Sequence, residues 1–267
     1  MNPLSRLLVS ATIVAMCTLP AHAASFKQAK KHYAAADYSA AITELQPLAK
    51  SGNADASNLL GEMYLQGVGV NIDIALAKTY FEAGARVGHL SALANLGDIL
   101  NREYKVELVT LEPLAEAGNA QAQNRLGRMY EFGQGHSINP QAAYTWYKKA
   151  ADQGHMDGRM NLARAHNFGL GTEQDFVKAE AGYLANAKAG HIDSMFFLGT
   201  MHFAQVSQAG LDSDRQAYAW LKVAAQNGHA TAAAMVTRLA IKLGDNLSHG
   251  DALYKEYATS YTTTTAN

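Results

Sequence analysis

Cysteine is almost absent from this chain of 267 residues, which contains only Cys17. One cysteine excludes an internal disulfide framework and a zinc site built from several thiolates. Charge is also scarce: 17% of the residues are charged, and the formal net charge is −1. Such a balance does not favour nucleic acid or an anionic membrane surface as a partner.

Residues 1–23 are typical of a secretory signal. Arg6 supplies the positive end, Leu7–Leu19 is a run of 13 mostly apolar residues, and Ala21-His22-Ala23 fits a cleavage site of the small-x-small kind. The alternative is a membrane anchor, but a spanning helix needs about 20 apolar residues. We therefore expect cleavage after Ala23, a periplasmic or secreted mature chain without a thiol, and no integral membrane protein.

One stretch of sequence, residues 120–154, defines a repeating unit. It begins with apolar residues at helical spacing, continues through a turn with Gly133 and Gly135, and enters a second helix at Asn139-Pro140. Asn is a good helix N-cap, and Pro suits the first helical position because it has no N–H to leave unpaired. The second helix ends at Gly154, which is suited to a left-handed C-terminal cap. The unit is therefore helix, turn, helix, stop.

The stop glycine recurs every 30 to 38 residues, a period that predicts a solenoid. Alanine stands three residues before each of these glycines and, with one exception, eleven residues before them. Small residues at fixed places let neighbouring helices pack closely. The stop glycines are Gly52, Gly88, Gly118, Gly154, Gly190 and Gly228.

The first helix of most units also contains a Leu-Gly pair, such as Leu126-Gly127. Glycine inside a helix costs about 1 kcal/mol relative to alanine, so its repetition needs a packing reason. We expect a bulky ring such as Trp146 or Trp220 to lie over it.

These markers place the whole solenoid at residues 24–258 and divide it into units. The third unit lacks the glycine turn and is short, so we expect a tight link near Asn101–Tyr104 between its two helices. Ser248 and Asp251 resemble a capping box for a last helix. The predicted units span residues 26–53, 54–88, 89–118, 119–154, 155–190 and 191–228, followed by a C-terminal cap at 229–258 and a disordered tail at 259–267.

The combined pattern of Ala122–Tyr130, Gly133–Gly135 and Ala143–Gly154 resembles the Sel1-like repeat, a relative of the tetratricopeptide repeat. The likeness covers roughly residues 26–229, although the fifth unit has Ala163 in place of the helical glycine and Gly182 in place of tryptophan. The resemblance implies an all-α, right-handed solenoid that acts as an adaptor or scaffold. It implies no shared catalytic residues, so we expect no enzyme.

Two sequence patterns could be mistaken for nucleotide-binding or metal-binding motifs. The Gly-x-Gly turns lack the third glycine of a dinucleotide fingerprint, so we interpret them as turns. Histidine follows the stop glycine four times, but equivalent residues of stacked units lie about 10 Å apart or more, too far to share a zinc ion bound at about 2 Å. We therefore interpret these residues as helix caps or packing residues, and we expect no metal and no cofactor. They are His89, His155, His191 and His229.

If the Leu-Gly pairs face inward, the residue before each Leu and the residue after each Gly share the opposite side of the first helix. In tetratricopeptide-like solenoids the first helices line the concave face, so these positions predict a groove that is acidic, then basic, then partly apolar. Arg and aromatic residues are enriched at the energetic centres of interfaces. The predicted partner-binding strip consists of Glu62, Asp98, Arg125, Arg128, Asn161, Arg164 and Phe197.

The sequence thus predicts a non-enzymatic scaffold that binds a protein partner in an envelope complex or signalling pathway through its concave face. The strip could instead be an ordinary charged surface. The alternative function is a binder of cell-wall or exopolysaccharide sugars, in which aromatic rings stack on the sugar. Trp146, Tyr147 and Trp220 stand at helix-core spacing, which favours burial over sugar contact.

Overall fold

The computed structural model describes residues 25–206 and 212–261. Within them the secondary structure consists of helices and turns, without strands, in agreement with the all-α prediction. The predicted signal segment and the tail beyond Tyr261 lie outside the described residues. The chain divides after Ile99 into two compact units, called here unit 1 and unit 2.

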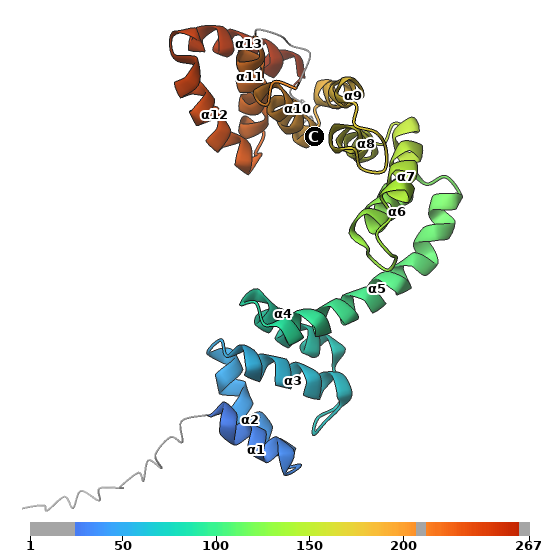
Figure 1. Cartoon of the computed structure of the whole chain (residues 1–267), viewed down its shortest axis with the longest axis vertical. Coiled ribbons are helices and arrows are strands. Elements are labelled where there is room, and N and C mark those ends of the chain that lie inside the picture. The colour runs from blue at the N-terminus through green and yellow to red at the C-terminus, as the bar shows by residue number, and fades with distance from the viewer. Residues whose placement is uncertain (1–24, 207–211, 262–267) are drawn as a thin grey trace, which may run out of the picture. The chain divides into compact units, whose positions relative to one another are not determined.

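Unit 1 holds two helix pairs and the beginning of a long helix (Figure 1). Its core has two clusters, one around Leu45, Leu60 and Met63 and the other around Phe81 and Ile99. The helices are α1 (Phe26–Ala34), α2 (Tyr38–Lys50), α3 (Ala54–Gln66), α4 (Ile74–Arg86) and the first part of α5 (Leu90–Glu116).

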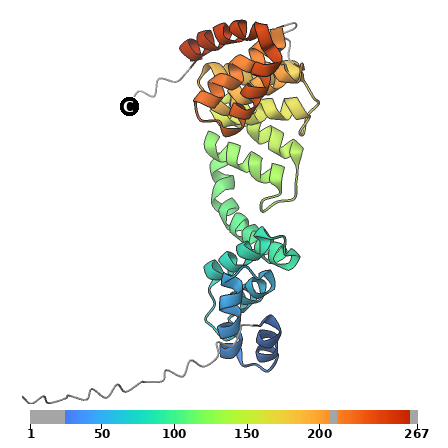
Figure 2. The same ribbon diagram turned by 90° about the vertical axis from the view of Figure 1, so that its left-hand side faces the viewer.

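Unit 2 contains the rest of α5 and the helices that follow it. They pack in chain order, and the last helix, α13, lies along α11 in both views (Figures 1 and 2). The elements are α6 (Ala120–Phe132), α7 (Pro140–Asp152), α8 (Met156–Phe168), α9 (Phe176–Lys188), α10 (Ile192–Phe203), α11 (Ser213–Gln226), α12 (Ala230–Leu243), the 3-10 helix η2 (Gly244–Asn246) and α13 (Leu247–Tyr261).

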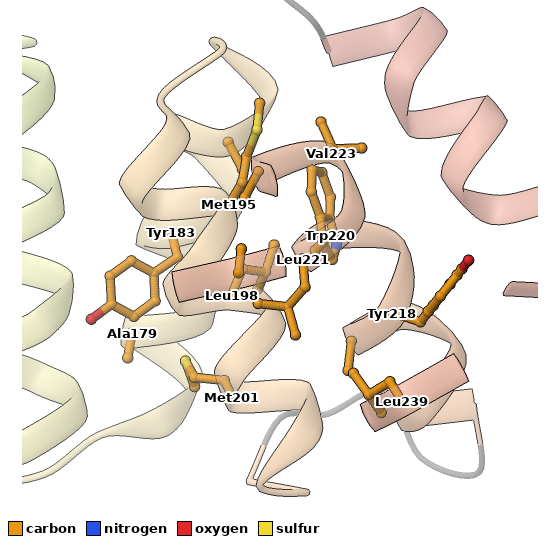
Figure 3. Packing of buried hydrophobic residues seen from close by; sticks show 14 of the residues in the cluster. Ala179, Tyr183, Met195, Leu198, Met201, Tyr218, Trp220, Leu221, Val223 and Leu239 are labelled. Atoms are coloured by element: carbon orange, nitrogen blue, oxygen red, sulfur yellow. The ribbon is translucent and has the colours of Figure 1, made fainter. Parts of the chain in front are cut away.

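The repeated alanines eleven residues before a stop glycine are buried, as predicted. Those that stand three residues before it are buried at Ala115, Ala151 and Ala187 and half-buried at Ala49, Ala85 and Ala225. All five at the position eleven residues before a stop glycine are at most 3% exposed. The largest core cluster, in unit 2, joins α8 to α12 and includes Tyr183, Trp220 and Leu198 (Figure 3). Small side chains therefore face the interior and let the larger ones interlock between successive helices. The five alanines are Ala41, Ala77, Ala143, Ala179 and Ala217.

The stop glycines connect the units by one recurring arrangement. All six have positive φ, between 83° and 96°, a region that glycine enters without steric cost. At the junction after α7, the N–H of Gly154 donates to the carbonyl of Ala151, and the N–H of His155 donates to the carbonyl of Ala150. This pair of bonds is a Schellman motif, which satisfies the last carbonyls of the helix.

The residue after each stop glycine also caps the next helix. The Nδ1 atom of His191 accepts a hydrogen bond from the N–H of Ser194, and its Nε2 atom lies 3.0 Å from Asp157 of the preceding first helix. Because Nδ1 accepts, the ring proton is on Nε2, which donates to the aspartate. The helix-cap interpretation of the four histidines is therefore confirmed, and Asn53 and Asn119 cap in the same way.

The predicted link inside the third unit is wrong, because α5 is one continuous helix from Leu90 to Glu116. The second, fourth and fifth units reverse direction through glycines with positive φ, such as Gly67 and Gly133. Residues Asn101–Tyr104 contain no glycine and no proline, so nothing in them ends a helix.

The last helix also differs from its prediction. It begins at Leu247, so Ser248 lies inside it and cannot be its N-cap. Asp251 instead accepts hydrogen bonds from the hydroxyl of Tyr218 and from the ammonium of Lys222, which lowers the pKa of its carboxyl. The helix continues to Tyr261, so the first residues assigned to a disordered tail, Thr259 to Tyr261, are helical.

The helical glycines Gly61, Gly127 and Gly199 are covered by the residue after the tryptophan position, which is an aromatic ring at the first two and Leu221 at the third. A Cβ atom built on Gly127 would lie 2.7 Å from the ring of Tyr147, and one on Gly61 would lie 2.5 Å from the ring of Phe81. The expectation that Trp146 or Trp220 lies there is wrong: Trp146 packs one position away, against α5 and α6, and Gly199 faces Leu221 and not Trp220. Gly97, in the irregular third unit, has nothing within 4 Å of such an atom.

Candidate partner-binding face

The first helices α6, α8 and α10 of unit 2 carry the basic and apolar members of the predicted strip. The turn after each first helix reverses the chain, so the second helix of the repeat runs antiparallel to the first. The next first helix then lies beside the previous one. Glu62 and Asp98 belong to unit 1.

Most residues of the predicted strip are bound within the chain. Arg125 makes two hydrogen bonds of 2.7 Å to the carboxylate of Glu107 and one of 2.7 Å to the side chain of Gln134. These hydrogen bonds, together with the positive charge of Arg125, lower the pKa of Glu107. This bidentate pair immobilises the guanidinium of Arg125 and holds α6 against α5. The two nitrogens that bind Glu107 are then not available as a bidentate donor to a partner.

Arg164 is likewise held by a neighbouring helix. Its Nη2 atom donates to the Oε2 atom of Glu131, and the hydroxyl of Tyr147 donates to the same oxygen at 2.6 Å. Burial raises the pKa of Tyr147, and the hydrogen bond to Glu131 raises it further. Burial alone would lower the pKa of Arg164, but the hydrogen bond to Glu131 and its charge outweigh that effect, so the pKa of Arg164 is raised. Three helices, α6, α7 and α8, therefore meet at one carboxylate.

Asn161 corrects the prediction that this position is exposed, since only 5% of it is accessible. Its side-chain amide donates to the Oδ1 atom of Asn124 at 2.8 Å, which joins α8 to α6. In unit 1, Asn95 donates to Asn58 at 3.1 Å, and both also donate to Glu62. Residues before the repeated Leu therefore connect successive first helices and do not face solvent.

Phe197 also belongs mainly to the interior. Its ring is half-buried and stacks on Tyr183, with 5.3 Å between the ring centroids. Two members of the strip differ from the others, because Arg128 in unit 2 and Asp98 in unit 1 are exposed. Neither has a side-chain hydrogen bond or an ion pair to another described residue.

Arg128 borders a cavity of about 350 Å³ on the face formed by α6, α8 and α10. Phe132, one turn further along α6, is 54% exposed at its edge. Met160 and the paired Arg164 supply further walls, and Asp157 and Asp193 stand at the beginnings of α8 and α10. We call this surface the α6–α8–α10 face, defined by Asn124, Arg128, Phe132, Asp157, Met160, Asn161, Arg164 and Asp193.

The sequence analysis did not identify Phe132 or Met160 as part of this face. The sequence contains a signal for Phe132. This large ring stands directly before the left-handed glycine that caps α6, at a position that is not on the core-facing side of the helix. Met160 has no such signal, since its exposure depends on how α8 and α10 pack.

The rings needed for sugar stacking are largely covered. Tyr147 and Trp220 are each 2% exposed, and Trp146 is half-buried beneath the ammonium of Lys149, which lies 3.8 Å from the ring centroid. No observation therefore favours the sugar-binding alternative. Within residues 25–206 and 212–261, no group of three or more His, Cys, Asp or Glu residues is placed to hold a metal ion.

None of the described helices is both long enough and apolar enough to cross a membrane. Comparison with known proteins finds two solved structures to which this chain is similar. A Sel1 repeat protein from Oxalobacter formigenes is 24% identical, with coverage of 90% of this chain and 98% of the other and a TM-score of 0.48. A protective antigen present in uropathogenic Escherichia coli strains, which displays an SLR fold, is 21% identical, with coverage of 89% and 61% and a TM-score of 0.39.

A model of the Sel1 repeat matches four segments that coincide with the regular helix pairs, residues 54–89, 120–155, 157–181 and 192–229, which together make up more than half of the sequence. The segments leave out residues 90–119, where α5 replaces a helix pair. Repeats of this family generally serve as scaffolds for protein interactions and are typically non-catalytic. On this match, the chain belongs to the Sel1 repeat family.

Proposed function

We propose that this protein is a non-enzymatic scaffold that binds a protein partner through the α6–α8–α10 face. The observation that carries the proposal is the exposed Arg128 beside the exposed ring of Phe132, at the edge of a cavity of about 350 Å³. Arg and aromatic side chains next to a concave surface are the usual anchors of an interface. The internal pairs of Arg125 and Arg164 support this role by keeping the helices in fixed register.

The charge of the face defines the chemistry of the partner. Glu131 compensates Arg164, whereas Arg128 has no counter-charge within hydrogen-bond distance among the described residues. Asp157 and Asp193 also line the cavity. A partner segment with an acidic group next to an apolar side chain would pair with Arg128 and cover Phe132.

We further propose that the mature protein acts in the periplasm or outside the cell, as part of an envelope complex or signalling pathway. This part rests on the sequence of residues 1–23, with Arg6, the apolar run Leu7–Leu19 and the Ala21-His22-Ala23 site. The test is N-terminal sequencing of the protein from fractionated cells. A mature chain that begins at Ala24 in the periplasmic or secreted fraction is expected, and an uncleaved chain in the cytoplasmic fraction contradicts the proposal.

The face itself can be tested by site-specific photo-crosslinking in living cells. A photoreactive phenylalanine analogue replaces Phe132, and crosslinked partners are identified by mass spectrometry. The matched control places the same analogue at Ile241, which is 78% exposed on α12, away from this face. A protein captured from position 132 and not from position 241 is the expected result.

Affinity measurements then separate a binding role from a structural role. Arg128→Ala should weaken binding of the captured partner by at least tenfold, since truncation of an interface anchor costs about 2 kcal/mol or more. Arg238→Ala, at an exposed arginine on α12, is the control and should leave affinity unchanged. Equal crosslinking from both positions, or an unchanged affinity of Arg128→Ala, would refute this assignment of the face.

A further inference from the structure

The fifth repeat lacks an aromatic ring that other repeats have at the same position. Three residues after the buried alanine of the second helix stand Tyr80, Trp146 and Trp220, whereas α9 has Gly182. The ring of Trp146 packs against a cluster that contains Ala115 and Leu126. The corresponding residues for Gly182 lie 36 positions later in the sequence, and they are Ala151 and Leu162.

At that place the structure has a cavity of about 400 Å³ between α7, α8 and α9. Leu162 is half-buried here, whereas its counterparts Leu60, Leu126 and Leu198 are at most 1% exposed. The wall that a ring covers in the neighbouring repeats is therefore accessible in this one. Its apolar lining consists of Ala151, Leu162, Ala163, Ala181, Gly182 and Ala185.

A buried polar atom without a partner adds a second observation. His166 lines the cavity and is 8% exposed, and its Nδ1 atom has no hydrogen-bond partner among the described residues. Burial lowers the pKa of His166, and the positive charge of Lys178 lowers it further. The imidazole is therefore neutral at neutral pH, with one donor and one acceptor nitrogen. A buried nitrogen without a partner costs about 1–3 kcal/mol, which a ligand with a hydrogen-bonding group would recover.

The rim of the cavity is polar. Lys178 pairs with Asp175 at 3.0 Å, and Asp152 pairs with Lys148 at 2.7 Å. Arg159 has a weaker contact, a distance of 3.5 Å from its Nε atom to the carbonyl oxygen of Ala151. Of the cations at the rim, Arg159 is therefore the best placed to form an ion pair with an acidic residue next to the group that enters the cavity.

We propose that this cavity binds the indole or phenol ring of a Trp or Tyr side chain from a partner polypeptide, which takes the place of the ring missing at Gly182. The volume falls within the range of about 300–1,000 Å³ that is usual for ligand pockets. The second, fourth and sixth repeats hold rings of this kind at the equivalent position. The inference rests on the proposed function in taking the occupant to be a protein. The residues that line this cavity, however, are not those of the α6–α8–α10 face.

Methyl NMR on the full chain, labelled at Ala and Leu, tests the proposal without knowledge of the partner. The probes are indole and N-acetyl-tryptophanamide, which carries the ring with its backbone attached, and N-acetyl-serinamide is the control probe. Both aromatic probes should shift the methyl signals of Ala151, Leu162 and Ala185, with a Kd on the order of 1 mM. The signals of Ala115 and Leu126, at the filled position, should stay unchanged.

The outcomes of this titration are decisive. Absence of shifts with both aromatic probes overturns the proposal. Binding of indole without binding of N-acetyl-tryptophanamide also overturns it, because the pocket would then take a free aromatic molecule and not a side chain. The probes bind independently of Arg128, so Arg128→Ala should not change these shifts. Failure here is therefore distinguishable from failure of the proposed function.

Two variants probe the pocket directly. Ala163→Gly combined with Gly182→Trp restores the residues of the neighbouring repeats, and the first change removes the Cβ atom that would lie 2.9 Å from a Cβ at position 182. The filled variant should lose the probe-induced shifts. His166→Phe keeps a ring beside Tyr144 and removes the nitrogen. Wild type should prefer indole over benzothiophene, which has no N–H, and this variant should not. Shifts that persist in the filled variant, or an unchanged preference in His166→Phe, would count against the pocket.

Discussion

The helical glycines of the Leu-Gly pairs provide a sharp test of the packing described above. Gly97 is exposed, and a Cβ atom there would meet nothing within 4 Å, so Gly97→Ala should stabilise unit 1 by about 1 kcal/mol through helix propensity alone. Gly61, in the same unit, faces the ring of Phe81 at 2.5 to 2.9 Å. Phe81 is fully buried, so its ring has little room to move.

Overpacking of this kind costs about 1–3 kcal/mol, which cancels or exceeds the propensity gain. Gly61→Ala should therefore be neutral or destabilising by up to about 2 kcal/mol, and the two substitutions should differ by about 1–3 kcal/mol. Gly127→Ala should repeat this result in unit 2, because Tyr147 is 2% exposed and its hydroxyl is bound to Glu131.

Urea unfolding followed by circular dichroism gives the overall effect. Native-state hydrogen exchange is the better assay, because a chain with two compact units need not unfold in one step. Amide protection in α3, α4 and the first part of α5 reports on unit 1 directly. The reasoning fails if Gly61→Ala and Gly127→Ala stabilise the protein as much as Gly97→Ala does.

Three further experiments test the junctions and the buried groups. His191→Ala should lower stability by about 1 kcal/mol, whereas His191→Asn should keep most of it because Asn also caps; urea unfolding measures both. Burial lowers the pKa of His202, so the unfolded chain binds more protons and stability should fall as pH drops below about 6.5; His202→Gln should make this slope shallower in unfolding titrations between pH 5 and 8. Arg125→Ala and Glu107→Gln should show a coupling of about 0.5–3 kcal/mol in a double-mutant cycle, and additive effects would contradict the bidentate pair.

The repeat frame was predictable because it depends on local chemistry. A glycine with positive φ, a cap residue directly after it and an alanine at a fixed distance can each be recognised within about a dozen residues of sequence. The junction at Gly154 and His155 illustrates this, since both the Schellman bonds and the cap involve neighbouring residues. The third unit was missed because the prediction extended the period through Asn101–Tyr104, where the local residues favour an uninterrupted helix.

The exposure of residues in the predicted strip was harder to predict because several of them take part in contacts between helices. Arg125 meets a carboxylate 18 residues earlier in the chain, and Arg164 meets one 33 residues earlier. The helical period shows that such side chains lie away from the core, but it does not show whether a neighbouring repeat supplies their counter-charge. Asn161 is the clearest example, since a polar residue at an outward position is buried by Asn124.

The cap histidines influence how far the loss of one contact between repeats destabilises the solenoid. His89 reaches Asp55, His191 reaches Asp157, and each of these contacts joins a repeat to its immediate predecessor. Disruption of one such contact should therefore destabilise the two repeats that it joins and have little effect on the repeats beyond them, because each repeat contacts only its neighbours.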